Sequence, residues 1–256
     1  MNRFKNKTVI VTGASSGIGK QTAIGFAKEG ANLAICARRE AKLKETAALC
    51  EAEGASVLAM ICDVTKKDQL TTFVNAIHEK FGTVDVLVNN AASANVMIPF
   101  IQQSENDLNM ALQSEVFATW NMMQLCYPLM KENGGSVINF GSNAAQGIPG
   151  YASYSAAKAA IMALTRSVAK EWGADNIKIN NMIPVAITDT NRESTDPNYQ
   201  KINEVMYEAI IAQSPFHRLS NPEEDIVPVI LFMASDESRW MTGQDFHAEG
   251  GLDIHF

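Results

Sequence analysis

Short hydrophobic runs that alternate with helical patterns constrain the fold of this chain more than any other feature. The runs that read as strands lie at residues 7–12, 32–36, 56–61, 84–88, 136–140 and 177–182. The helical patterns between and after them lie near 18–29, 40–53, 67–81, 104–131 and 152–173. The first, fourth and fifth runs are almost continuously apolar, as in parallel strands that are covered on both faces. The alternation predicts an α/β fold: a Rossmann-like, doubly wound parallel sheet of about seven strands with helices on both faces.

Composition narrows the class of protein further. No linker, repeat or charge block divides the 256 residues, so we expect one domain over 1–256. The net charge of −7 disfavours nucleic acid and anionic membranes as partners. The four dispersed cysteines form no CxxC motif or Cys/His cluster, so we expect no metal site, no disulfides and a reducing, cytoplasmic location. No apolar stretch approaches the roughly 20 residues that span a bilayer.

A glycine-rich segment follows the first predicted strand directly. It reads Thr12-Gly13-Ala14-Ser15-Ser16-Gly17-Ile18-Gly19, and a helical pattern comes next. Glycines at these positions allow a tight turn and a close approach of the backbone to a pyrophosphate, and the helix N-terminus offers free N–H groups. The strand before and helix after favour a dinucleotide site over a plain tight turn. The candidate cofactor contacts here are Gly13, Ser15, Ser16, Gly17, Ile18 and Gly19.

Two arginines, Arg38 and Arg39, end the second predicted strand. In dinucleotide folds an acidic residue near this point binds the ribose 2′-hydroxyl of NAD, whereas arginine accommodates the 2′-phosphate of NADP. Ala37 precedes the pair, so no carboxylate is present to repel a phosphate. The pair therefore favours NADP(H), with Arg38 as the principal contact; the alternative is two solvated arginines that begin a helix.

A tyrosine and a lysine four residues apart open the helical pattern at 152–173. Tyr154 and Lys158 share one helix face, and a nearby ammonium favours the phenolate form of a tyrosine. Ser142 follows the fifth predicted strand and is placed to hydrogen-bond a substrate oxygen. This set predicts hydride transfer between a nicotinamide and a carbonyl or alcohol carbon, with Tyr154 as general acid or base.

Together, TGASSGIG and Ser142…Tyr154-x3-Lys158 resemble the short-chain dehydrogenase/reductase family, and further landmarks extend the resemblance along the whole chain. The resemblance implies that Asp63 and Val64 contact the adenine and that Asn90 lies beside the adenosine ribose. It also implies that Lys158 holds the nicotinamide ribose. Pro184, Ile187 and Thr188 are expected near the nicotinamide amide, and Asp189 and Thr190 are alternatives for the last two. Asp63 has an alternative reading as a turn or helix-cap residue.

One position departs from the family pattern. The family carries an asparagine in the helix after its NNAG motif, where it holds a water beside the lysine. Here that position is occupied by Glu115. A carboxylate there would pair with Lys158 or bind the same water, so Glu115 joins the catalytic candidates. The alternative is that the match to the family pattern is shifted by one residue, which would leave Glu115 exposed or at a subunit contact.

The tyrosine has a rival. Tyr151 stands seven residues before Lys158, which is the Tyr-x6-Lys spacing of the family's enoyl reductases. Those enzymes usually lose the TGxxxGxG loop, which is intact here, so we favour Tyr154.

The predicted function is an NADP(H)-dependent carbonyl reductase or alcohol dehydrogenase for a hydrophobic ketone or alcohol. A looser similarity to bacterial bile-acid hydroxysteroid dehydrogenases suggests a hydroxysteroid or bile acid; the alternatives are a 3-oxoacyl thioester reductase and a catalytically silent NADP-sensing protein. The family and the apolar helices at 104–131 and 152–173 imply a homotetramer. We also expect residues 188–220 to form a lid over the substrate; the alternative is a simple surface loop.

Overall fold

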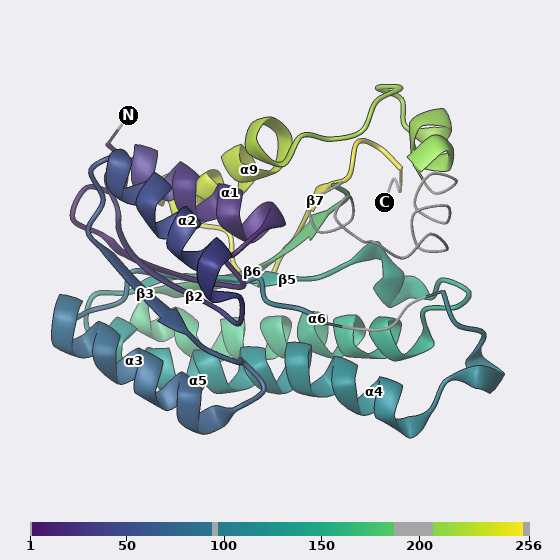
Figure 1. The fold of residues 1–256 in the computed structure, drawn as a ribbon, viewed down its shortest axis with the longest axis horizontal. Coiled ribbons are helices and arrows are strands. Elements are labelled where there is room, and N and C mark those ends of the chain that lie inside the picture. Colours follow the sequence, from purple (N-terminus) through teal and green to yellow (C-terminus); the bar gives the residue numbers. More distant parts are fainter. Residues whose placement is uncertain (1, 94–96, 187–206, 253–256) are drawn as a thin grey trace.

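A seven-stranded parallel sheet forms the centre of the molecule (Figure 1). The computed structural model describes residues 2–93, 97–186 and 207–252. The strand order is β3-β2-β1-β4-β5-β6-β7, and each strand runs parallel to its neighbours. The strands are β1 (Thr8–Thr12), β2 (Asn32–Ala37), β3 (Val57–Ile61), β4 (Val86–Asn89), β5 (Gly135–Phe140), β6 (Ile177–Pro184) and β7 (Asp245–Ala248). The predicted doubly wound α/β fold is confirmed.

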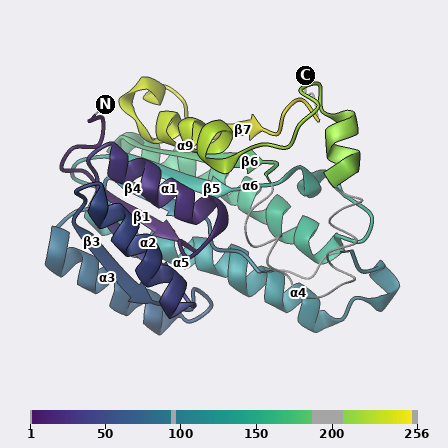
Figure 2. The ribbon, with the colours of Figure 1, turned by 45° about the horizontal axis from the view of Figure 1, so that its top comes forward.

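Helices cover both faces of the sheet (Figures 1 and 2). Helices α1, α2 and α9 lie on one face, and α3, α5 and α6 lie on the other. The α-helices are α1 (Gly17–Lys28), α2 (Glu40–Ala52), α3 (Lys67–Phe81), α4 (Glu105–Ala111), α5 (Ala118–Met130), α6 (Ala152–Trp172) and α9 (Val227–Ala234). Residues 207–213 are also helical.

The core explains why the strand sequences are apolar throughout. Side chains alternate along a strand, so Val9 and Val11 of β1 pack under α1 and α9, whereas Ile10 packs under α3 and α5. All three are fully buried. A strand covered on both faces cannot show polar alternation, and β1 accordingly reads as one hydrophobic run.

The sheet order reverses beside β1, because β2 continues to one side and β4 to the other. In open α/β sheets a ligand binds outside the carboxyl ends of the strands at such a reversal. The glycine loop that follows β1 and residues Asn89 and Asn90 at the end of β4 meet at this point.

One predicted helix is wrong in detail. The pattern at 104–131 reads as a continuous helix, but the structure interrupts it with a π-helical turn, η2 (Leu112–Phe117), between α4 and α5. A second π-helical turn, Pro222–Ile226, precedes α9, and the Asn221 side chain caps it by accepting from the Glu223 N–H at 3.0 Å. Within the described residues, no helix is both long and apolar enough to cross a bilayer.

Candidate active site

The glycine loop has the shape of a phosphate cradle. Gly13 and Gly17 have φ of +68° and +57°, a region that favours glycine. A Cβ on Gly19 would lie 2.5 Å from the Gly13 carbonyl oxygen, so no larger residue fits there without movement. Helix α1 begins at Gly17 with no side-chain cap, which leaves its first amides directed to the loop. The described residues therefore fit a dinucleotide pyrophosphate.

Asn90 holds this loop from the neighbouring strand. Its Nδ2 donates to the carbonyl oxygens of Thr12 at 2.9 Å and of Gly13 at 3.3 Å. Its backbone N–H donates to Thr12 Oγ1 at 3.1 Å. The side-chain amide thus fixes the shape of the cradle, and the ribose contact implied by the resemblance stays a prediction.

The two arginines after β2 point to different partners. The Arg39 guanidinium donates to Ser15 Oγ at 3.2 Å and to Ser16 Oγ. Arg38 is exposed, and its charge acts on Asp63. Arg39 therefore lies against the phosphate loop, although the sequence pointed first to Arg38.

Asp63 forms a local turn at the end of β3. Its Oδ1 accepts from the Thr65 N–H at 3.0 Å and from Thr65 Oγ1 at 2.8 Å. Partial burial opposes ionisation, but these bonds and the charge of Arg38 lower the pKa of Asp63 below its ordinary value. The hydrogen bonds of Asp63 are therefore those of a turn residue. Val64, which follows it at the same edge of the sheet, is half-buried.

Lys158 is buried at the carboxyl end of β5, with 3% of the residue exposed. Its Nζ donates to the Phe140 carbonyl oxygen at 2.8 Å and lies 2.6 Å from Glu115 Oε2. It also lies 5.3 Å from the centroid of the Tyr154 ring. Burial alone would lower the pKa of Lys158, but the charges of Tyr154 and Glu115 outweigh it and raise that pKa above its ordinary value. The site therefore holds a charged ammonium beside the phenol.

Glu115 reaches Lys158 from the π-helical turn η2 and is 1% exposed. Apart from the ion pair, none of the described residues hydrogen-bonds either carboxylate oxygen. The register that puts Glu115 beside Lys158 matches the structure, so the alternative of an exposed Glu115 does not hold.

Tyr154 and Ser142 complete the arrangement. Tyr154 lies in the first turn of α6, one turn before Lys158. Ser142 caps a short 3-10 helix, Asn143–Gln146, and its Oγ accepts from the Ala144 N–H at 3.1 Å, which leaves its hydroxyl proton free to point elsewhere. Tyr151 lies just before the helix, and its ring centroid is 6.1 Å from that of Tyr154.

Large apolar side chains are exposed at the same end of the molecule. Exposed fractions are 78% for Phe100, 90% for Ile101, 44% for Ile148 and 69% for Phe216. The segment that carries Phe100 and Ile101 packs against the start of α6, because Ile98 N–H donates to the Gly150 carbonyl oxygen at 3.1 Å. Phe100, Ile101, Ile148 and Phe216 are together called the apolar rim, and the bond from Ile98 connects the segment of Phe100 and Ile101 to the loop that precedes Tyr154.

Some predicted contacts lie at the margin of the described structure. Pro184 ends β6 at this edge of the sheet. Ile187, Thr188 and most of the expected lid, through residue 206, lie outside the described residues.

Motif reasoning missed Gln103, which braces the start of α6. Its Nε2 donates to the Ile98 carbonyl oxygen at 2.8 Å, and its Oε1 accepts from the Ser153 N–H at 3.1 Å. A lone glutamine in a loop carries no sequence signal for such a role.

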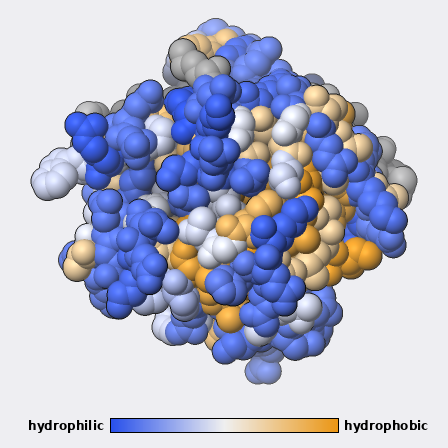
Figure 3. Space-filling view, turned by 90° about the vertical axis from the view of Figure 1, so that its left-hand side faces the viewer, coloured by the Kyte–Doolittle hydropathy of each residue, from blue (hydrophilic) through white to orange (hydrophobic). Residues whose placement is uncertain are grey.

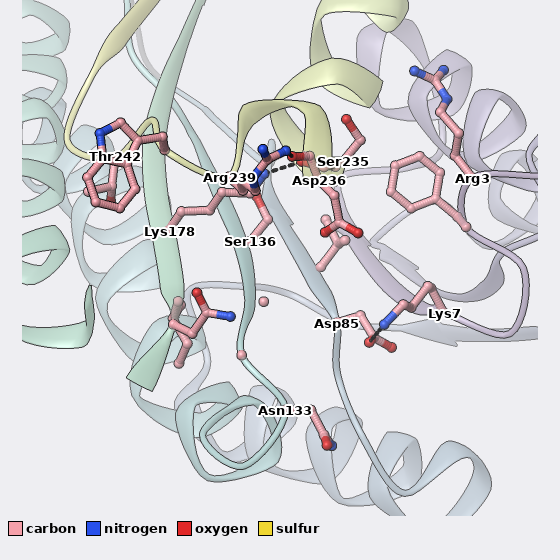
Figure 4. A pocket seen from close by; sticks show the side chains of 18 of the residues that line it. Arg3, Lys7, Asp85, Asn133, Ser136, Lys178, Ser235, Asp236, Arg239 and Thr242 are labelled. Atoms are coloured by element: carbon pink, nitrogen blue, oxygen red, sulfur yellow. Dashed lines mark hydrogen bonds and ion pairs between the residues drawn. The ribbon is translucent and has the colours of Figure 1, made fainter. Parts of the chain in front are cut away.

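A separate hollow of about 360 Å³ lies at the opposite, amino end of the strands (Figures 3 and 4). Figure 3 looks onto this end, where hydrophilic residues surround a central group of apolar ones. Basic and acidic side chains line it, and Lys7 Nζ lies 2.8 Å from Asp85 Oδ1. Lys178 points into it between Ser235 and Ser136 (Figure 4). This hollow is far from the site residues described above.

Comparison with known proteins agrees with this geometry. A family model described as enoyl-(acyl carrier protein) reductase matches residues 13–253. A 12alpha-hydroxysteroid dehydrogenase from a Clostridium species is 36% identical over 98% of both chains. A 3-oxoacyl-[acyl-carrier-protein] reductase from Thermotoga maritima is 35% identical over 98% of this chain and 100% of that protein. A crystal structure described as a short-chain alcohol dehydrogenase from Sinorhizobium meliloti 1021 superposes with a TM-score of 0.89, at 31% identity and 97% coverage of each chain.

Proposed function

Since the chain belongs to the short-chain dehydrogenase/reductase family, we propose that it is an NADP(H)-dependent carbonyl reductase or alcohol dehydrogenase for a hydrophobic ketone or alcohol. The observation that carries the proposal is the cluster of Tyr154, Lys158 and Glu115 at the carboxyl end of the sheet, beside the glycine cradle. A protein that only senses a cofactor has no need of a positioned general acid.

Each residue of the site has a separate role in the proposed proton transfer. The nicotinamide cofactor, when bound, supplies or accepts the hydride. In reduction the Tyr154 hydroxyl protonates the developing alkoxide, and Ser142 donates a hydrogen bond to the same oxygen. The Lys158 ammonium stabilises the phenolate that remains. The Phe140 carbonyl and Glu115 fix the position of that ammonium.

The first prediction tests the tyrosine. We expect Tyr154→Phe to lower kcat by about 10³-fold or more, because the proton donor is lost, while cofactor binding is retained. Tyr151→Phe is the matched control, since it removes the same hydroxyl 6.1 Å away between ring centroids. Steady-state kinetics with equilibrium cofactor titration measures both. A dead Tyr151→Phe enzyme with an active Tyr154→Phe enzyme would identify the enoyl-reductase arrangement instead.

The cofactor preference is proposed from the end of β2. Ala37 offers no carboxylate to a ribose, and Arg38 and Arg39 follow it. Arg39 contacts the two serines of the phosphate loop, which supports bidentate binding of a 2′-phosphate by its guanidinium. Arg38, beside Asp63, adds a second positive charge.

The second prediction separates the two arginines. Arg39→Ala should lower the NADPH-to-NADH ratio of kcat/KM by about 10- to 150-fold, which corresponds to about 1.5–3 kcal/mol of lost charged hydrogen bonding. Arg38→Ala should change the ratio less, because Asp63 partly offsets its charge. Equal use of both cofactors by the wild type would refute the preference. Dissociation constants of NADP⁺ and NAD⁺ provide a measurement that needs no substrate.

The substrate class is proposed from the apolar rim and from the relatives. Phe100, Ile101, Ile148 and Phe216 suit a large apolar body, and a hydroxysteroid or bile acid has one. The 35% identity to a 3-oxoacyl-[acyl-carrier-protein] reductase favours a 3-oxoacyl thioester as the second candidate. A panel of bile acids, 3-oxoacyl thioesters and sugars with both cofactors distinguishes them. Cofactor binding without turnover of any member would favour a silent NADP sensor.

The third prediction concerns assembly. Leu108, Phe117 and Trp120 are 40–49% exposed along α4, η2 and α5, and an exposed apolar helix face suits a second copy of the chain. We therefore propose a homo-oligomer, a tetramer by family resemblance. Light scattering at micromolar concentration should give about four times the monomer mass of 27.8 kDa. A monomer mass would contradict the proposal, and Trp120→Glu should lower the measured mass.

A further inference from the structure

A row of polar side chains crosses four buried strands next to the active site. Asn89, Asn139, Asn181 and Asp245 lie in register on β4, β5, β6 and β7. The three asparagines are at most 6% exposed. Polar groups in such a position are costly unless each finds a hydrogen-bond partner, so a row of them calls for a physical reason.

The row is joined into one chain of hydrogen bonds through helix α6. Asn89 Nδ2 donates to Asn139 Oδ1 at 2.9 Å, and Asn139 Nδ2 donates to Thr165 Oγ1 at 2.9 Å. Thr165 Oγ1 then donates to Asn181 Oδ1 at 2.7 Å, and Asn181 Nδ2 donates to Asp245 Oδ1 at 2.7 Å. The far carboxylate oxygen of Asp245 pairs with Arg166. Every bond donates in the same direction, and the chain ends on a group that can only accept, so the bonds reinforce one another.

Thr165 connects this chain to the helix that carries the reacting groups. It lies on α6, seven residues after Lys158, and therefore on the same face about 10 Å away along the axis. It contacts β5 through Asn139, and the next residue of β5, Phe140, provides the carbonyl that accepts from Lys158. A hydroxyl fixed between two strands prevents α6 from sliding along the sheet.

The other end of the chain reaches the cofactor cradle. Asn89 directly precedes Asn90, whose side chain holds the carbonyls of Thr12 and Gly13. The same set of bonds therefore ties the glycine loop, strand β5 and helix α6 together.

We propose that Thr165 is a positioning residue, which through Asn139 and Asn181 fixes α6 on the sheet so that Lys158 meets Phe140 and Glu115. The proposal rests on the proposed hydride-transfer function for its kinetic consequence. Its structural consequence, the environment of Lys158, is independent of that function.

The test compares three threonine variants. Thr165→Val keeps the shape and removes both hydrogen bonds, and Thr165→Ser restores the hydroxyl. Thr46→Val is the matched control, because Thr46 is also fully buried in a helix. Its hydroxyl donates at 3.1 Å to the Lys42 carbonyl oxygen of the same helix, α2. We expect Thr165→Val to lower kcat by about tenfold or more with KM changed less than about twofold, since misplacement affects the transition state first. Thr165→Ser should recover most of kcat, and Thr46→Val should not change it.

A second readout needs no substrate. In protein labelled with ¹³C at the lysine ε-carbon, the Lys158 signal, assigned by its loss in Lys158→Arg, should shift in Thr165→Val and return in Thr165→Ser. A folded Thr165→Val protein with wild-type kcat and an unmoved Lys158 signal overturns the proposal. A moved signal without turnover of any substrate by the wild type would instead discredit the proposed function alone.

If Thr165→Val does not fold, Asp245→Ala decides the question from the accessible end of the chain, where the carboxylate is 18% exposed. We expect a smaller change of kcat and of the Lys158 signal in the same direction. No change in either quantity would overturn the proposal.

Discussion

Two lysines at opposite ends of the same sheet have opposite pKa shifts. Lys158, at the carboxyl end of β5, is buried and has a raised pKa. Lys178, near the amino end of β6, is half-buried, and burial lowers its pKa to about 8. The more deeply buried ammonium is thus the one that holds its proton more firmly.

The difference lies in the groups that the two ammonium groups meet. Lys158 has a carboxylate 2.6 Å away, from Glu115. Lys178 donates to the Ser235 carbonyl oxygen and to Ser238 Oγ at 2.6 Å, and the charge of Asp236 offsets only part of the cost of burial. Neutral acceptors do not offset the cost of removing a charge from water as well as an anion does. The comparison teaches that the charged form of Lys158 depends on the groups that face it, Tyr154 and Glu115.

The fourth prediction removes the carboxylate that distinguishes Lys158 from Lys178. Glu115→Gln should leave Lys158 buried without an anion from η2 and lower the free energy of unfolding by about 3 kcal/mol. It should also lower kcat, because Lys158 loses the carboxylate that fixes its position while the shape of the side chain at residue 115 remains. Urea unfolding and kcat from pH 5 to 9 measure the two effects.

Glu45→Gln is the control for this variant. It removes a carboxylate 2.6 Å from Lys20, but Glu45 is 61% exposed, so we expect a loss of less than about 1 kcal/mol. Equal losses for the two variants, or an unchanged kcat in Glu115→Gln, would show that the buried pair has no special role.

The fifth prediction concerns Lys178 and has a smaller expected effect. The folded protein holds this proton with a pKa of about 8, against an ordinary value of 10.5. Between these values the unfolded chain binds more protons, so stability rises with pH across this window and is independent of this group below about pH 8. Relative to Lys178→Met, the wild type should therefore gain about 1–2 kcal/mol from pH 8 to 10.5, after allowance for solvent screening. Thermal unfolding of both proteins over this range measures the gain, and parallel curves would contradict it.

The sequence predicted those features that depend on local chemistry. The predicted bounds of the six strands agree with the structure to within two residues, because parallel strands that are buried on both faces consist mostly of apolar residues. The glycine loop was predictable because few other residues adopt its backbone. Strand β7 was not located, because Asp245–Ala248 has no β-branched residue and only partly buried side chains.

Features that depend on how the elements pack were harder to predict. Arg38 and Arg39 are adjacent, and which of them meets the phosphate loop follows from the direction in which the chain leaves β2. Thr165 and Asn139 look like interruptions of apolar patterns until the register of β5 and the placement of α6 bring them together. The Glu115–Lys158 pair came from the family alignment, since periodicity alone gives no distance between η2 and α6.

The π-helical turn between α4 and α5 corrects the phase of a helix. Residues Asp107, Ala111, Glu115, Thr119 and Met123 are all buried, at intervals of four. In an ideal α-helix this interval drifts by about 40° at each step, and so by about 160° from the first to the last. The wider turn at Leu112–Phe117 rotates less per residue and recovers part of that drift. One irregular turn thus keeps these five residues on the buried side of the helix, with Glu115 in the turn where the two helical phases join.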